Sequence, residues 1–291
     1  MCDIRKVGIV GLGTMGTGIS IVVTRAGFET ILVDQNEHIL ESSLQQIANF
    51  FKKSVEKKKI TEEKAKNIIN SIKTHTEYKY LSECDVIIEA VYEDFKTKKL
   101  VFQELNKICL QKTIFVSNTS TLSITSLAAA SNRPDRFIGM HFCLPAQVMK
   151  LVEVTRGLQT SDETFQTAMN FGKALGQTCV LTKDAPGFIL NRFIVAFNNM
   201  CIKAYENNLA SKEDIDKAVK LGLGYPMGPF ELLDYIGLDT QLRVSLALFE
   251  QTKDIRYWPP SIVSKMVDAG YLGRKTGKGF YNYDRISIFG A

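Results

Sequence analysis

Histidine is scarce in this chain, and one of its three histidines is placed for acid–base chemistry. His141 ends the apolar run 137–142, and Glu153 lies in a second such run, 151–154. If both runs are strands and Pro145 marks a reversal between them, the two side chains meet. A carboxylate beside an imidazole fixes its tautomer and stabilises the imidazolium. Such a pair can accept the proton of a hydroxyl group while a hydride leaves the carbon that bears this hydroxyl. The alternative is a core histidine with a structural partner.

Two further polar groups are candidates for binding a substrate near that pair. The segment Ser117-Asn118-Thr119-Ser120-Thr121 directly follows a strand-like run, so its side chains are expected at the carboxyl edge of a sheet, where ligands bind. Capping of the next helix is the alternative role, and the two roles are compatible. Asn191 lies within an otherwise apolar helical stretch, where asparagine is a poor helix former and is costly to bury without partners. It would reach the ligand crevice if that helix crosses the mouth of the crevice.

The motif Gly11-Leu12-Gly13-Thr14-Met15-Gly16 has the spacing of a turn that binds a dinucleotide, and it stands between an apolar run and a helical pattern. Gly11 allows the tight turn off the strand. Gly13 lets the backbone approach a pyrophosphate, and Gly16 lets the helix and strand pack closely. The free N–H groups and the positive dipole end of the new helix, which Thr14 and Met15 open, are expected to face the phosphates.

Asp34 closes the second apolar run, residues 30–33, and selects between two cofactors. Its carboxylate is expected to accept hydrogen bonds from the adenosine ribose and to repel a 2′-phosphate, which favours NAD over NADP. The alternative, a glycine turn that binds nothing, requires the spacing, the strand, the helix and the acid to coincide by chance.

These residues need a parallel sheet to bring them to one edge, and the sequence predicts such a sheet. Apolar runs alternate with helical patterns, which is typical of an α/β fold, so residues 1–185 are predicted to form a Rossmann-type, doubly wound NAD-binding domain. The predicted strands cover residues 7–10, 30–33, 85–91, 114–117, 137–142, 151–154 and 178–181.

A helical hairpin is predicted as an insertion after the second strand. Its first helix covers residues 38–58, and its second starts at 61 and includes Ile72. His38 and His75 fall in this insertion and are expected on the surface. Lysines cluster around its tip: Lys52, Lys53, Lys57, Lys58, Lys59, Lys64 and Lys66. They are either a solvated helix end or a landing site for a polyanion such as the phosphates of an acyl carrier.

The composition changes at residues 184–187, and residues 186–291 are predicted to form an all-α domain for substrate binding and dimerisation. Helices are expected over 188–207, 212–221, 229–249 with a break near Gly237, and 261–269. The apolar residues of the first of these helices exceed what a small bundle would bury, so we predict a homodimer through this domain.

Charge and composition exclude several classes of protein. The net charge of +5 is modest, and the excess of basic residues is concentrated in the lysine cluster of the helical insertion. This distribution does not indicate a nucleic-acid-binding surface. Six scattered cysteines without metal-ligand spacing predict no metal site and suit reduced thiols in a cytoplasmic protein. The N-terminal residues contain no apolar signal region, and no apolar run approaches the length of a membrane span.

These motifs together resemble the L-3-hydroxyacyl-CoA dehydrogenase family, most closely its bacterial 3-hydroxybutyryl-CoA dehydrogenases, over nearly the whole chain. The matching stretches are VGIVGLGTMGTGI, Val91-Tyr92-Glu93-Asp94 with Lys98, SNTSTLSIT, the frame from His141-Phe142 to Val152-Glu153-Val154, DAPGFILNR, GLGYPMGPFE and RKTGKGFY. This combination is far more specific than the glycine motif alone.

The resemblance implies that the chain interconverts a short 3-hydroxyacyl thioester and its 3-oxoacyl form with NAD. It implies that His141 is the acid/base and Glu153 its partner, and that Ser120 and Asn191 hold the substrate oxygens. The implied cofactor site adds three residues to those of the glycine turn and Asp34: Glu93, Lys98 and Asn118.

Two departures from the family pattern leave the acyl carrier open. Leu144 stands where relatives have an asparagine of the carrier site, and Phe51 where a relative has a serine that contacts CoA, whereas Lys58 keeps the phosphate-contacting lysine. An acyl-carrier-protein thioester, as in the biosynthesis of polyketide extender units, is therefore an alternative substrate. A free hydroxy acid is a further alternative, and a redox-silent NAD-binding structural protein is an alternative of another class.

Overall fold

The computed structural model describes residues 4–283, which form two compact units that divide after Phe188. The sequence placed the domain boundary after Ala185, three residues earlier. Cys2 lies outside the described residues. Within 4–283, no helix combines the length and the apolar content needed to cross a membrane.

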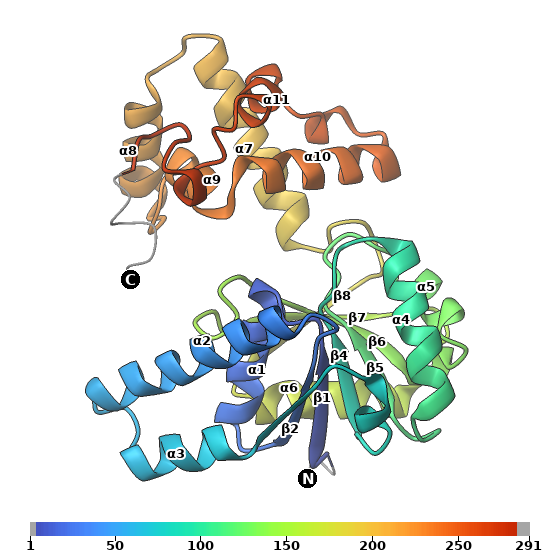
Figure 1. Ribbon diagram of the computed structural model, residues 1–291. Helices are drawn as coiled ribbons and strands as arrows, with labels where there is room; N and C mark the ends of the chain where they lie inside the picture. The colour runs from blue at the N-terminus through green and yellow to red at the C-terminus, as the bar shows by residue number, and fades with distance from the viewer. Residues whose placement is uncertain (1–3, 284–291) are drawn as a thin grey trace. The chain divides into compact units, whose positions relative to one another are not determined.

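The first unit is built on an eight-stranded sheet with the strand order β3-β2-β1-β4-β5-β6-β7-β8 (Figure 1). The strands are β1 (Lys6–Val10), β2 (Glu29–Val33), β3 (Ile72–His75), β4 (Val86–Glu89), β5 (Ile114–Ser117), β6 (Phe137–Phe142), β7 (Leu151–Arg156) and β8 (Thr178–Thr182). Neighbouring strands are parallel except for β6 and β7, which run antiparallel. The predicted Rossmann-type sheet is therefore confirmed, with one reversal in it.

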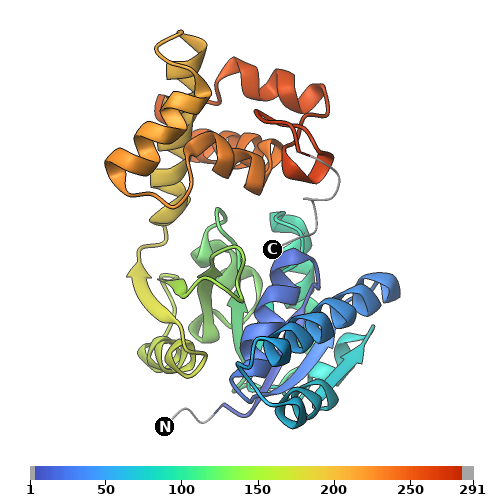
Figure 2. The same ribbon diagram turned by 90° about the vertical axis from the view of Figure 1, so that its left-hand side faces the viewer.

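Helices cover both faces of this sheet, because alternate residues of the strands point to opposite sides. The helices are α1 (Thr14–Arg25), α2 (Glu37–Glu56), α3 (Glu62–Asn70), α4 (Phe95–Ile108), α5 (Ile124–Ala130) and α6 (Asp162–Ala174). One apolar cluster joins α1, α2 and α6 to Val7 and Ile9 of β1, and the other joins α4 and α5 to Phe115 of β5. α2 and α3 project as a hairpin beside α1 (Figure 1), and Figure 2 views the first unit from the side of this hairpin.

The predicted helical hairpin is wrong in one respect, because its end is a strand. Ile72 was assigned to the second helix, but it begins β3, which pairs with β2 at the edge of the sheet. His75 ends β3 half-buried, with its ring stacked 3.6 Å from that of Tyr80, rather than on the open surface. Ile72 follows Ile68 and Ile69 by four and three residues, which is the spacing of one face of a helix. The strand has only four residues, so its alternation of side chains was not recognisable in the sequence. The exposed position of His38 agrees with the prediction.

The second unit is all-α in its regular elements, as predicted. Its helices are α7 (Leu190–Glu206), α8 (Lys212–Leu223), α9 (Pro229–Ile236), α10 (Leu238–Thr252) and α11 (Ser261–Asp268). Gly237 separates α9 from α10 at a φ of +96°, which confirms the predicted break. Phe230 and Leu233 of α9 pack with Phe280 of the glycine-punctuated tail in the core of this unit.

Buried Asp234 of α9 fixes that tail to the helices. Its carboxylate accepts hydrogen bonds from the backbone N–H groups of Phe280 and Tyr281, both at 2.8 Å, and from the hydroxyl of Tyr283 at 3.0 Å. Since only 1% of Asp234 is exposed, these donors replace the water that the carboxylate loses on folding. The tail is thus part of the core of this unit.

Candidate active site

His141 and Glu153 meet as the sequence predicted. The antiparallel register of β6 and β7 places the two residues directly opposite each other, and Glu153 Oε2 lies 2.7 Å from His141 Nδ1. The Glu153 side chain is fully buried, whereas 13% of the His141 side chain is exposed. The contact uses Nδ1, so Nε2 is the nitrogen that can exchange a proton with a substrate. The ring of buried Phe188 packs 5.9 Å from the imidazole.

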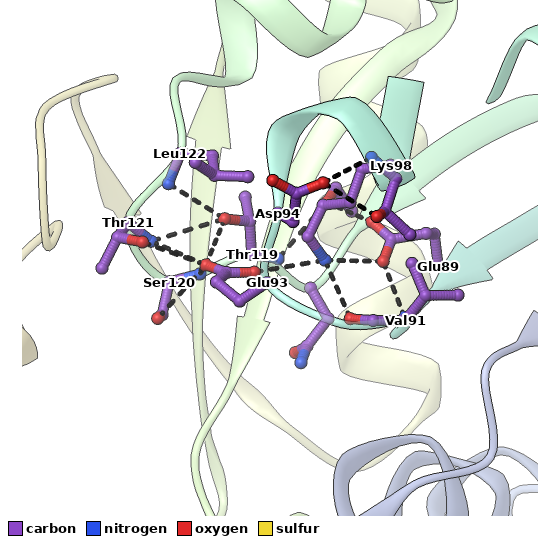
Figure 3. A network of polar contacts seen from close by, with 12 residues as sticks. Glu89, Val91, Glu93, Asp94, Lys98, Thr119, Ser120, Thr121 and Leu122 are labelled. Atoms are coloured by element: carbon purple, nitrogen blue, oxygen red, sulfur yellow. Dashed lines mark hydrogen bonds and ion pairs between the residues drawn. The ribbon is translucent and has the colours of Figure 1, made fainter. Parts of the chain in front are cut away.

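Ser120 lies in a loop whose conformation depends on Glu93. Glu93 Oε1 accepts hydrogen bonds from Thr119 Oγ1 at 2.6 Å, from the Ser120 N–H at 2.8 Å and from the Thr121 N–H at 3.2 Å (Figure 3). Burial by itself would raise the pKa of Glu93, but Lys98 and the donors of the loop hold that pKa below its usual value. Glu93 is therefore an ionised anchor for the Ser120 loop.

Asp184 holds the other end of this loop, a role that the sequence did not reveal. Its carboxylate accepts from the N–H groups of Ile124 and Thr125, at 2.9 and 2.8 Å, and from the hydroxyl of Ser123 at 3.0 Å. These are free donors at the start of α5, which a carboxylate satisfies well. The segment that carries Ser120 is consequently held by Glu93 at residues 119–121 and by Asp184 at residues 123–125.

Lys98 is enclosed by protein rather than open to a ligand. Only 1% of its side chain is exposed, and Nζ contacts Glu89 Oε1 at 2.6 Å and Glu93 Oε2 at 3.2 Å (Figure 3). Burial lowers the pKa of Lys98, but the two carboxylates outweigh it and hold the pKa above its usual value. Burial raises the pKa of Glu89, against the opposing effect of Lys98. Sequence analysis missed Glu89, although an acid that closes a buried strand, as Asp34 does, was a usable signal.

The glycine turn has the geometry that its spacing predicts for a dinucleotide. Gly11 adopts a φ of +87°, and a Cβ on Gly16 would lie 1.8 Å from the Gly11 carbonyl oxygen, so neither tolerates a side chain. A Cβ on Gly13 would meet nothing within 4 Å, which leaves its backbone open to a ligand. Thr14 and Met15 open α1, with Thr14 exposed and Met15 half-buried. These residues fit the phosphates of NAD.

Asp34 and Asn118 each accept hydrogen bonds that join neighbouring segments at the carboxyl edge of the sheet. Asp34 Oδ2 accepts from the N–H of Leu12 in the glycine turn at 2.8 Å, and Oδ1 accepts from the Asn36 N–H at 3.0 Å. Asn118 Oδ1 accepts from the Phe142 N–H at 2.9 Å, next to His141. Besides their predicted part in the cofactor site, both residues therefore position the loops around it.

The predicted carrier residues differ in their placement. Lys58 is exposed in the turn between α2 and α3, and 41% of Leu144 is exposed in the loop between β6 and β7. Phe51, by contrast, is 1% exposed and packs in the core against α1, so its side chain is a core residue rather than part of a docking surface. Asn191 belongs to the second unit, in the first turn of α7 and half-buried, where its low helix propensity matters little.

Residues 4–283 contain no group of three or more His, Cys, Asp or Glu side chains arranged to hold a metal ion.

Comparison with known proteins assigns both units to one family. Residues 6–185 match the family model for the NAD binding domain of 3-hydroxyacyl-CoA dehydrogenase, and residues 187–283 match the model for its C-terminal domain. The chain is 44% identical to the human mitochondrial hydroxyacyl-coenzyme A dehydrogenase, over 96% of this chain and 91% of that protein. It is 41% identical to a probable 3-hydroxybutyryl-CoA dehydrogenase of Bacillus subtilis, over 97% and 98%.

Solved structures agree with this assignment. The (S)-3-hydroxybutyryl-CoA dehydrogenase of Ralstonia eutropha superimposes with a TM-score of 0.92 at 41% identity, covering 97% of this chain and all of that chain. FadB2 of Mycobacterium tuberculosis gives a TM-score of 0.94 at 36% identity, covering 97% and 99%. The chain therefore belongs to the 3-hydroxyacyl-CoA dehydrogenase family and is an NAD-dependent enzyme.

Proposed function

We propose that this enzyme interconverts a short-chain 3-hydroxyacyl-CoA, such as 3-hydroxybutyryl-CoA, and its 3-oxoacyl form, with His141 as the acid/base. The observation that carries the proposal is the 2.7 Å contact between His141 Nδ1 and the buried carboxylate of Glu153. A pair of this kind has no evident use in a purely structural NAD-binding protein, which speaks against that alternative. The names of the relatives from Bacillus subtilis and Ralstonia eutropha support the acyl group.

The proton transfer follows from this geometry. NAD, when bound, supplies the hydride acceptor. His141 Nε2 takes the proton of the 3-hydroxyl, and the imidazolium that forms is stabilised by Glu153 across Nδ1. The hydroxyl of Ser120, on a loop fixed by Glu93 and Asp184, donates to the same substrate oxygen and polarises it. In the reverse direction the protonated His141 returns the proton to the 3-oxo oxygen.

Asn191 is proposed to hold a second substrate oxygen, as the family resemblance implies, and Lys58 to contact the phosphates of the carrier. Asp34, Glu93, Lys98 and Asn118 are proposed parts of the cofactor site, with Lys98 acting through Glu93 because its ammonium is enclosed. These assignments concern binding and positioning rather than the proton transfer itself.

A thioester of an acyl carrier protein is the second candidate substrate. Two observations favour it. Leu144 is exposed where relatives have a polar carrier contact, and the lysines at the tip of α2 and α3 are exposed. An acidic carrier protein would complement these lysines. The buried position of Phe51 removes part of the argument for a changed docking surface.

The deciding experiment measures NADH oxidation with acetoacetyl-CoA beside the same acyl group on a carrier protein. Rapid turnover of the CoA ester is expected and would place the enzyme in hydroxyacyl-CoA metabolism. Turnover of the carrier-protein thioester alone would favour the second candidate, and turnover of neither would contradict both.

A further inference from the structure

Three charged side chains behind the Ser120 loop leave one net negative charge in the protein interior. Glu89 and Lys98 are 0% and 1% exposed, and Glu93 is 23% exposed. Lys98 Nζ contacts both carboxylates, at 2.6 Å and 3.2 Å. Burial raises the pKa of Glu89, and Lys98 and the Ser117 hydroxyl oppose this effect. With both carboxylates ionised, the two carboxylates and one ammonium sum to a charge of −1, so the lysine neutralises only half of the negative charge around it.

Hydrogen bonds favour the ionised form of both carboxylates. Glu89 Oε1 accepts from the Val91 N–H at 2.8 Å in addition to Lys98 (Figure 3). Glu89 Oε2 accepts from the Ser117 hydroxyl at 2.7 Å. Glu93 accepts from Lys98 and from several donors of the Ser120 loop. Donors on both oxygens stabilise a carboxylate over its acid.

This charge lies at the edge of the sheet where the dinucleotide of the family binds. Glu89 is the last residue of β4 and pairs in register with Val10, the last residue of β1, immediately before the glycine turn. A Cβ on Gly11 would lie 2.7 Å from the Val91 nitrogen, whose N–H Glu89 holds. Ligands of open α/β sheets bind at the carboxyl ends of such strands, where the strand order switches direction.

We propose that Glu89 raises the affinity of the site for NAD⁺ relative to NADH. The two forms differ by a positive charge on the nicotinamide ring, and a net negative charge behind the site attracts only the oxidised form. Glu89 is fully buried, so it acts through its charge and through the position of Val91 rather than by contact with the cofactor. Buried Glu153 adds an effect of the same sign, so removal of Glu89 abolishes only part of the effect of the buried carboxylates on the ratio of the two affinities.

Glu89→Gln isolates the charge, because the glutamine fits the same hydrogen bonds. Its carbonyl oxygen accepts from Lys98 and Val91, and its amide group donates to the Ser117 hydroxyl. The ratio Kd(NAD⁺)/Kd(NADH) is expected to rise on the order of tenfold, the effect of one unit charge over roughly a nanometre at an effective dielectric constant of about 20. NADH is titrated by its fluorescence and NAD⁺ by competition with NADH. Interactions with parts common to both forms cancel in this ratio.

Ser117→Ala is the matched control, because it removes one hydrogen bond to Glu89 and retains the carboxylate, which Lys98 and the Val91 N–H still stabilise. Its ratio is expected to equal that of the wild type, even where both dissociation constants shift together. Glu89→Met also removes the charge with a side chain of similar size, so it decides the question if Glu89→Gln does not fold. An unchanged ratio in folded Glu89→Gln, or in Glu89→Met in its place, would overturn the proposal. No acyl substrate is present in these titrations, so their outcome is independent of the thioester proposed above.

Discussion

The tautomer of His141 follows from its contact with Glu153. The carboxylate is an acceptor, so it selects the neutral imidazole that carries its proton on Nδ1 and leaves Nε2 free to take another. The full burial of Glu153 strengthens this effect, because the carboxylate has little water to screen it. The contact therefore fits the proposal that the two residues act together in proton transfer.

His141→Ala is expected to lower turnover of acetoacetyl-CoA by about two to four orders of magnitude, the range of general acid–base catalysis. The affinity for NADH, measured by fluorescence titration, should remain largely that of the wild type. His38→Ala is the control, because His38 is exposed on α2. A His141→Ala enzyme with near-normal turnover would refute the assignment.

Asp34 holds the glycine turn and is proposed to repel a 2′-phosphate, and substitutions can separate these two roles. Asp34→Asn keeps an acceptor for the Leu12 N–H but loses the charge that repels a 2′-phosphate, so the preference for NADH over NADPH in kcat/KM should fall by about an order of magnitude. Asp34→Ala also loses the hydrogen bond to the glycine turn and should weaken the binding of both cofactors. An unchanged preference in both variants would mean that other residues recognise the 2′ position.

The sequence predicted the residues whose roles depend on local spacing and missed those whose partners are distant. Glycine spacing predicted the turn, and Pro145 predicted the reversal that joins His141 to Glu153. Asp184, however, acts on residues 123–125, about sixty positions earlier, a contact that only the fold creates.

At the scale of elements, the sequence predicted the helices and the buried strands of the first unit close to their observed bounds. The helices show their own period, and the four-residue strands β4 and β5 are apolar runs buried along their whole length, as strands of a parallel sheet are. β3 has four residues and continues the apolar spacing of α3, so no period distinguished it from the helix. Pairing with β2 decides its structure, and pairing is a tertiary effect.

The carboxylate of buried Asp234 accepts three hydrogen bonds from the tail of the second unit. Asp234→Ala would leave the N–H groups of Phe280 and Tyr281 without their acceptor, so the free energy of unfolding is expected to fall by about 2 to 4 kcal/mol. Thermal and urea denaturation measure this loss. Asp268→Ala is the control, because Asp268 is an exposed residue at the end of α11 and should change stability little. Equal stability of the two variants would contradict the anchoring role of Asp234.

For the whole molecule, the exposed apolar side chains of α7 support the homodimer predicted from the sequence. Phe193 and Met200 are 70% and 65% exposed, and their spacing of seven residues places them on one side of the helix. Single exposed apolar residues are ordinary, but two on one face of an apolar helix favour a covered surface.

Phe193→Asp is expected to convert a dimer into a monomer of 32.6 kDa in light scattering after gel filtration, because an aspartate would be buried unpaired in the interface. Leu158→Asp is the control, since Leu158 is 89% exposed in the first unit and should leave the dimer intact. A wild-type protein that is monomeric at micromolar concentration would contradict the prediction.

The antiparallel pairing of β6 and β7 has a consequence for how this enzyme can diversify. Pairing with β6 on one side and with β8 on the other holds β7 in register, which keeps Glu153 opposite His141. We therefore expect the connecting loop, which contains Leu144, to tolerate changes of sequence while the two side chains stay aligned. The proposed reaction and the range of substrates could then change independently. The strand pair would keep the contact between His141 and Glu153, while changes in the loop could alter which acyl carrier is bound.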